Sequence, residues 1–137
     1  MSRGGALSLP PELEERLSQL GQEFQVDFLQ RALSRHPDNF EALSEFATLL
    51  TRLGRLEEGL AADERLVELA PRDPTVHYNL ACSLALLARP EQALDALEHA
   101  AALGYRDTEH LLADEDLASL HAEARFLALV ASLRAAE

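Results

Sequence analysis

The 137-residue sequence contains one cysteine, no tryptophan and no lysine, so each of its 12 basic residues is an arginine. The lone Cys82 excludes an intramolecular disulfide and a cysteine-rich metal site. Aromatic residues make up only 5% of the chain, whereas hydrophobic residues make up 47%. A core must therefore be built from Leu and Ala. Both residues favour helix, because they lose little side-chain freedom there.

The chain is strongly acidic, with 24 acidic residues against 12 basic ones and a formal net charge of −12 at pH 7. Such a charge repels phosphate backbones and anionic lipid, so we expect neither nucleic acid nor a membrane surface as a partner. The first residues hold no apolar run long enough for a signal peptide, and no later stretch is apolar enough to span a bilayer. We expect a cytoplasmic protein of one domain.

The sequence repeats itself with a period of 34 residues, which separates Pro37 from Pro71. When residues 40–71 are aligned with the residues 34 positions later, small residues align with small ones and large residues with large ones. Examples are Ala47 on Ala81, Leu50 on Leu84, Leu60 on Leu94 and Ala62 on Ala96. A repeat of this length is typical of stacked helical hairpins.

Each period divides into two helical segments. Apolar residues recur three or four positions apart from Phe40 to Leu53, which predicts one helix, and Gly54 then interrupts the pattern. A second helix follows and ends before Pro71. Asp38 and Asp73 are expected to cap the helices that follow them, and Pro90 suits the first turn of its helix.

These residues resemble the tetratricopeptide repeat (TPR) family. One repeat places Leu43, Phe46, Ala47, Leu50, Gly59, Asp63 and Pro71 at its signature positions, and the next places His77, Leu80, Ala81, Leu84, Ala93, Leu97 and Tyr105 there. The resemblance implies an all-α, right-handed helical-hairpin solenoid of about three repeats. Because Asp63 replaces the usual aromatic residue, we expect irregular packing of the second helix around residues 63–66.

The two ends of the chain are less regular than its middle. After a disordered tail at residues 1–9, repeats are expected near residues 10–38, 39–72 and 73–105. In the first of them, Gly21 is expected to form a turn that follows a helix with a buried stripe of Leu13, Leu17 and Leu20, although one bent helix is an alternative. Residues 106–137 resemble the closing segment of bacterial TPR proteins. Its final helix would bury Phe126, Leu129, Val130 and Leu133 and so cover the end of the core.

The TPR resemblance implies a concave wall, formed by the first helix of each repeat, that binds a protein or peptide. The outward positions of this wall are Glu41, Ser44, Thr48, Arg52, Thr75, Tyr78, Asn79 and Cys82. Tyr78 is the expected anchor, since tyrosine offers a large contact area with few rotors. The partner is expected to be neutral to basic with apolar anchors. A carboxylate clamp is disfavoured because the chain has no lysine.

The leading interpretation is thus a non-catalytic adaptor or scaffold without cofactor or metal, either a monomer or a weak homodimer. A first alternative is a TPR-type secretion chaperone, because such chaperones are also short, acidic and helical. A second is a metal-dependent enzyme using His110, Asp114, Glu115, Asp116 and His121. Asp114 and Asp116 are better explained as helix caps. Cys82 is interpreted as a small structural residue, since no base shares its helix face.

Overall fold

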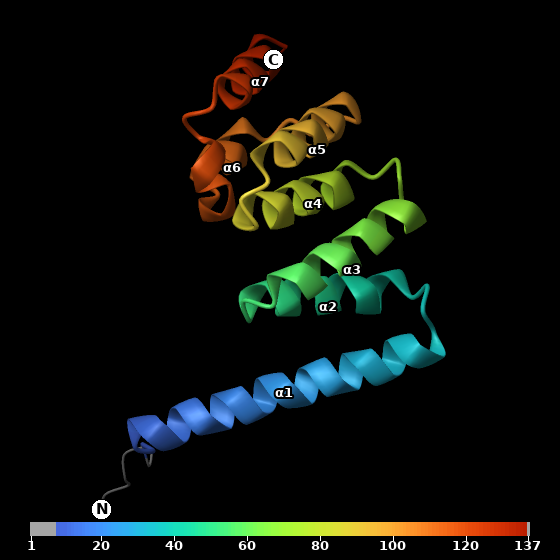
Figure 1. The fold of residues 1–137 in the computed structure, drawn as a ribbon, viewed down its shortest axis with the longest axis vertical. Coiled ribbons are helices and arrows are strands. Elements are labelled where there is room, and N and C mark those ends of the chain that lie inside the picture. Colours follow the sequence, from blue (N-terminus) through green and yellow to red (C-terminus); the bar gives the residue numbers. More distant parts are fainter. Residues whose placement is uncertain (1–7, 137) are drawn as a thin grey trace, which may run out of the picture.

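The computed structural model describes residues 8–136, which form a stack of helices and, within that range, contain no strand. The helices are α1 (Pro11–Arg35), α2 (Phe40–Arg52), α3 (Leu56–Leu69), α4 (Pro74–Leu86), α5 (Pro90–Ala102), α6 (Thr108–Ala113), the 3₁₀ helix η1 (Glu115–Leu120) and α7 (Ala124–Ala135). They follow one another along the long axis, with the two chain ends at opposite ends of the stack (Figure 1). None of these helices is long and apolar enough to cross a membrane.

The predicted helical hairpins are present as α2–α3 and α4–α5. Gly54 has a φ of +78° in the turn between α2 and α3, a left-handed conformation that glycine adopts without strain. Asp73 caps α4 by accepting a hydrogen bond from the amide of Thr75 at 2.9 Å, as predicted. The cap assigned to Asp38 is wrong. Asn39 caps α2 instead, because only its side chain reaches the amide of Ala42, while Asp38 pairs with Arg65.

Small side chains allow the helices of each hairpin to approach closely. A Cβ atom at Gly59 of α3 would lie 2.8 Å from the hydroxyl oxygen of Thr51 on α2, so only glycine fits there without displacing its neighbour. In the next hairpin Ala81 and Ala93 occupy the equivalent contact and are fully buried. The repeated small positions therefore act as close contacts between paired helices, as the 34-residue alignment predicted.

Helix α3 is unbroken from Leu56 to Leu69, so its backbone shows no irregularity around residues 63–66. Leu66 is buried, and Asp63 is buried as well. The Asp63 carboxylate accepts a hydrogen bond from the Ser83 hydroxyl of α4. A buried polar group is costly unless it has a hydrogen-bond partner. Ser83 provides that partner, so Asp63 can occupy a position where the repeat signature has an aromatic residue.

The N-terminal segment is one helix, so the turn expected at Gly21 is wrong. Good helix formers flank Gly21, and one glycine inside such a helix costs about 1 kcal/mol without breaking it. Leu13, Leu17 and Leu20 are exposed rather than buried, so the predicted burial of this stripe is wrong as well. Figure 1 shows the N-terminal half of α1 projecting beyond α2. Only the C-terminal half contributes buried residues, Val26 and Leu29.

The C-terminal helices pack against the α4–α5 hairpin. The buried side chains Leu111, Leu117, Leu120, Phe126, Val130 and Leu133 join those of α4 and α5 in one core cluster, and Leu129 packs against it. On the surface, Arg125 of α7 forms ion pairs with Glu91, Asp95 and Glu98 of α5. Helices α6, η1 and α7 (residues 108–135) are here called the cap. They provide the apolar contact that a further hairpin would otherwise make.

Replacing Phe126 by Ala tests whether the cap is a true part of the core. Phe126 is fully buried, and such truncations usually destabilise by about 3–5 kcal/mol. The neighbouring Leu127 is 52% exposed, so Leu127→Ala should change the free energy of unfolding by less than about 0.5 kcal/mol. Urea denaturation of both variants measures the difference. Equal effects would show that the cap is not packed as described.

Candidate functional site

A cavity of 590 Å³ is lined by side chains of α2, α3 and α4 and of the C-terminal segment from α6 to the start of η1. Six of the eight residues predicted for the concave wall line it together: Ser44, Thr48, Arg52, Tyr78, Asn79 and Cys82. Glu41 and Thr75 are exposed on the same two helices but lie outside this lining. The three-and-four spacing on α2 and α4 therefore brings most of the predicted wall to one surface.

Tyr78 belongs to the wall itself rather than projecting from it. Only 5% of the residue is exposed, and its ring stacks on Tyr105 with 4.7 Å between ring centroids. The phenol donates a hydrogen bond to the Asp114 carboxylate at 2.5 Å. Burial, and next this hydrogen bond, raise the pKa of Tyr78. A side chain held on two sides offers little contact area, so Tyr78 does not provide the projecting anchor that was predicted.

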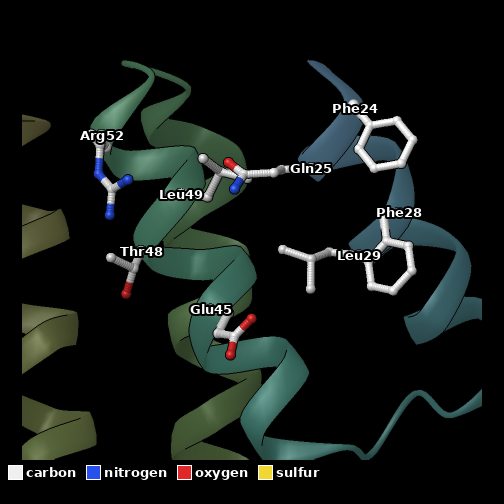
Figure 2. A pocket seen from close by; sticks show the side chains of 8 residues that line it. All are labelled: Phe24, Gln25, Phe28, Leu29, Glu45, Thr48, Leu49 and Arg52. Atoms are coloured by element: carbon white, nitrogen blue, oxygen red, sulfur yellow. The ribbon is translucent and has the colours of Figure 1, made fainter. Parts of the chain in front are cut away.

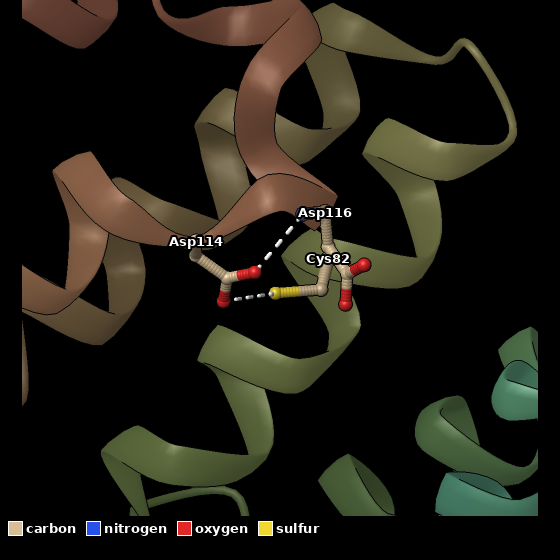
Figure 3. A group of neighbouring side chains, drawn as sticks. All are labelled: Cys82, Asp114 and Asp116. Carbon is tan, nitrogen blue, oxygen red and sulfur yellow. Dashed lines mark hydrogen bonds between the residues drawn. The ribbon is translucent and has the colours of Figure 1, made fainter.

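Asp114 connects the cap to the wall of the cavity. It follows α6, and its carboxylate caps η1 by accepting a hydrogen bond from the amide of Asp116 at 3.0 Å, which confirms the predicted cap. The other carboxylate oxygen accepts from the Cys82 thiol, with 3.7 Å between sulfur and oxygen (Figure 3). Asp116, the second predicted cap, lies inside η1, and its side chain makes no capping contact there.

Cys82, Asp114 and Asp116 each place one potential metal-ligand atom within 4.8 Å of the others. Burial, and then the charges of the two aspartates, raise the pKa of the Cys82 thiol. Burial also raises the pKa of Asp116, with Asp114 and Glu115 adding to the effect. A protonated thiol is a poor ligand and a poor nucleophile. Helix capping by Asp114 and its hydrogen bond with Cys82 account for two members of this cluster, whereas the Asp116 carboxylate takes part in neither contact.

The histidines of the proposed metal-enzyme alternative do not converge on that cluster. His110 lies near it, with 3.5 Å between its Nε2 atom and the Asp114 carboxylate. The ring of His121 instead contacts the carbonyl oxygen of Leu111 at 3.2 Å and packs against Phe126. Within residues 8–136, the grouping of three potential ligands is Cys82 with the two aspartates. The five residues of that alternative therefore do not form one site.

Most of the charged side chains that line the cavity are acidic. Asp63, Asp114 and Asp116 line it, and Arg52 is its only arginine or lysine among the described residues. Burial raises the pKa of Asp63 to about 6, although the hydrogen bond from Ser83 acts in the opposite direction. Leu56, Leu66 and Leu86 supply apolar surface beside these charges. The surface thus combines negative charge with leucine side chains.

Sequence reasoning missed the part of the site that the cap supplies. His110, Asp114 and Asp116 line the cavity because η1 packs against α4. Their spacing indicated helix caps, and a cap motif does not tell on which side of the preceding hairpin it will lie. Asp63 was noticed only as an exception to the repeat signature. An aspartate where the repeat signature has an aromatic residue was the available sequence signal that a polar side chain lines this cavity.

A second groove of 330 Å³ lies between α1 and α2, and it was not predicted. Figure 2 shows Leu29 of α1 pointing toward α2, with the rings of Phe24 and Phe28 at the side of α1. Leu49 completes the apolar part of the groove, while Gln25, Glu45, Thr48 and Arg52 supply its polar part. Thr48 and Arg52 also line the main cavity, so the two hollows adjoin along α2.

No family model and no curated protein matches the sequence. Solved structures of MamA have a similar fold. "Crystal structure of MamA protein" has a TM-score of 0.68 and 15% identity, covering 89% of this chain and 69% of that one. "MamA MSR-1 C2" has a TM-score of 0.64 and 16% identity, covering 88% and 71%. "MamA RS-1 ArsTM double mutant" has a TM-score of 0.63 and 19% identity, covering 88% and 70%.

These likenesses concern the fold, because the identities are low. Together with the helix pairing, they confirm the predicted all-α helical-hairpin solenoid of the TPR type.

The buried Asp63 predicts a pH dependence of stability. Its pKa rises from 3.8 to about 6 on folding, so the native state binds more protons than the unfolded state between these values. The free energy of unfolding should therefore fall by ~3 kcal/mol as the pH rises through this window. Asp63→Asn removes the ionisation and should become progressively more stable than wild type from pH 4 to pH 7, as followed by urea denaturation.

Glu64→Gln is the matched control, because Glu64 is the exposed neighbour of Asp63 on the same helix. Its stability relative to wild type should stay nearly constant over the same range. If Asp63→Asn behaved in the same way, Asp63 would not titrate as a buried group.

Proposed function

We propose that this chain is a non-catalytic protein-binding module that holds a segment of a partner protein in the cavity between α2, α4 and the cap. The observation that carries this proposal is the cavity itself, a hollow of 590 Å³ lined by side chains of both hairpins and of the cap. Its walls are helices fixed by buried small-residue contacts at Gly59, Ala81 and Ala93. A preformed rigid surface loses little conformational entropy on binding.

The charges of the cavity favour a neutral-to-basic partner segment with apolar anchors. Three aspartates face one arginine across the hollow, in a chain whose net charge is −12. Complementary charge accelerates association and disfavours acidic competitors. The exposed Leu86 offers an apolar contact beside the charges. A clamp for a partner's terminal carboxylate is disfavoured, since Arg52 would have to act against three neighbouring aspartates.

Two features of the cavity support a binding role over a catalytic one. The Cys82 thiol has a raised pKa and hydrogen-bonds to Asp114, so it is not activated as a nucleophile. The Tyr78 hydroxyl donates to the same carboxylate and has a raised pKa as well. Both groups keep their protons and are used to hold the cap against α4.

Selection from a displayed library of random peptides tests the proposal. Peptides that combine Arg or Lys with leucine-like residues should be enriched on the immobilised full-length chain. The double variant Thr48→Arg, Asn79→Arg adds two positive charges at exposed positions of the cavity. It should bind the selected peptides about tenfold more weakly or worse, because like charges then face each other.

The matched control is Ala61→Arg, Gln92→Arg, which adds the same charge at exposed positions of α3 and α5 outside the cavity lining. It should retain most of the peptide affinity, and circular dichroism should show that both variants keep the helix content of wild type. If both double variants lost the same peptide affinity, the loss would come from the change in net charge and not from contacts in the cavity. Enrichment of acidic peptides would contradict the proposed partner chemistry.

A further inference from the structure

Helix α1 has two apolar faces, and only one of them is covered. Val26 and Leu29 are buried against α2. On the other side, Leu13, Leu17, Leu20, Phe24 and Phe28 follow one another at intervals of three or four residues and are all exposed. With about 100° per residue, this second set, here called the α1 stripe, points away from the face that packs on α2. A surface helix of a monomer normally carries charged or polar residues there.

The α1 stripe is too apolar for an ordinary solvent-exposed helix face. Phe24 and Phe28 are 71% and 61% exposed, and the three leucines are 51%, 55% and 45% exposed. Since a phenylalanine contributes up to roughly 200 Å², these five side chains leave on the order of 500 Å² uncovered. Two such stripes facing each other would bury about 1,000 Å² of apolar surface, which reaches the size of a small specific interface.

The spacing of the stripe also suits pairing with an identical helix. From Leu13 to Phe24 the intervals alternate between four and three residues, as in the seam of a helix pair, and Phe28 follows one helical turn later. The seam runs straight through Gly21, the residue at which a turn was expected. Beyond the backbone of α1 itself, no atom of residues 8–136 lies within 4 Å of a Cβ built at Gly21, so no packing contact among these residues requires glycine there. At the crossing point of two helices, however, a missing side chain leaves room for the opposing leucine.

The charges beside the stripe favour an antiparallel arrangement. Arg16 and Glu23 lie seven residues apart, on the same flank of the stripe. When two helices pair antiparallel about Leu20 and Gly21, these flanks face each other, and Arg16 of each copy comes within reach of Glu23 of the other. A parallel pair would separate the two flanks. It would also place the acidic first turns, with Glu12 and Glu14, side by side.

We propose that the α1 stripe is a homodimer interface in which two copies of this chain pair through α1 in antiparallel orientation. Leu13 and Leu17 of each copy contact Phe28 and Phe24 of the other. Leu20 packs against the other copy's Gly21. The projecting N-terminal half of each α1 thereby lies along Phe24 and Phe28 of its neighbour, which also line one edge of the groove between α1 and α2. A two-fold axis makes the contact self-limiting.

Sedimentation velocity over a concentration series of the full-length chain tests this interface. Wild type should sediment with twice the chain mass of 15.1 kDa. Leu17→Glu places a charge in the seam and should raise the dimer Kd by roughly 100-fold. Because Leu17 is 55% exposed within one chain, the variant should keep its fold, which circular dichroism checks.

Leu127→Glu is the matched control, since Leu127 is 52% exposed on α7 and the substitution is the same. It should leave the dimer intact. If wild type sedimented as a monomer at every concentration, the proposal would be overturned. The α1 stripe would then be a contact surface for a different protein. A dimer that Leu17→Glu does not weaken would overturn it as well, because the interface would then lie elsewhere.

Two cysteine variants test the orientation, since the native Cys82 is buried. Leu13→Cys mixed with Phe28→Cys should form a disulfide-linked pair under mild oxidation, visible as a band of double mass on a non-reducing gel. Neither variant alone should form it. A disulfide within each variant alone would indicate parallel helices and would overturn the antiparallel arrangement.

Discussion

The close approach of paired helices at small side chains is the constraint on which the rest of this structure depends. Gly59 leaves no space for a Cβ atom beside Thr51, and Ala81 and Ala93 are fully buried in the next hairpin. Because a core packed at this density resists a shift of even one methylene, these contacts fix how the helices of each hairpin lie. The outward positions of α2 and α4 are fixed with them, and so is the wall of the cavity.

The middle of the chain was predictable because its signal is periodic. Repetition after 34 residues identified both hairpins, and the three-and-four spacing brought six of eight predicted wall residues to one cavity. Contacts between distant segments were not predictable in the same way. The hydrogen bonds of Tyr78 to Asp114 and of Ser83 to Asp63 join residues 36 and 20 positions apart. Nothing in local spacing reveals such partners, and so Tyr78 was expected to project from the wall.

The error at Gly21 has a different origin. Glycine is a local signal for a turn, but its cost inside a helix is only about 1 kcal/mol, which the helix formers around it outweigh. The apolar stripe that continues from Leu17 to Phe24 was the better evidence, because its period does not change at the glycine. The same stripe was expected to be buried within the chain. That expectation was wrong for the single chain, in which Leu13, Leu17 and Leu20 are exposed, and the proposed second copy would cover them.

Asp63 relates the stability of the fold to the binding role proposed for the cavity. Its burial disfavours the ionised form, so the folded chain loses stability as this carboxyl group deprotonates. A hydrophobic side chain at that position would avoid this loss, and the aromatic expected there is of that kind. In the proposed binding mode, a cationic group of the partner entering the cavity would favour the ionised carboxylate and offset part of the loss. The departure from the repeat signature would then serve partner recognition at the expense of stability.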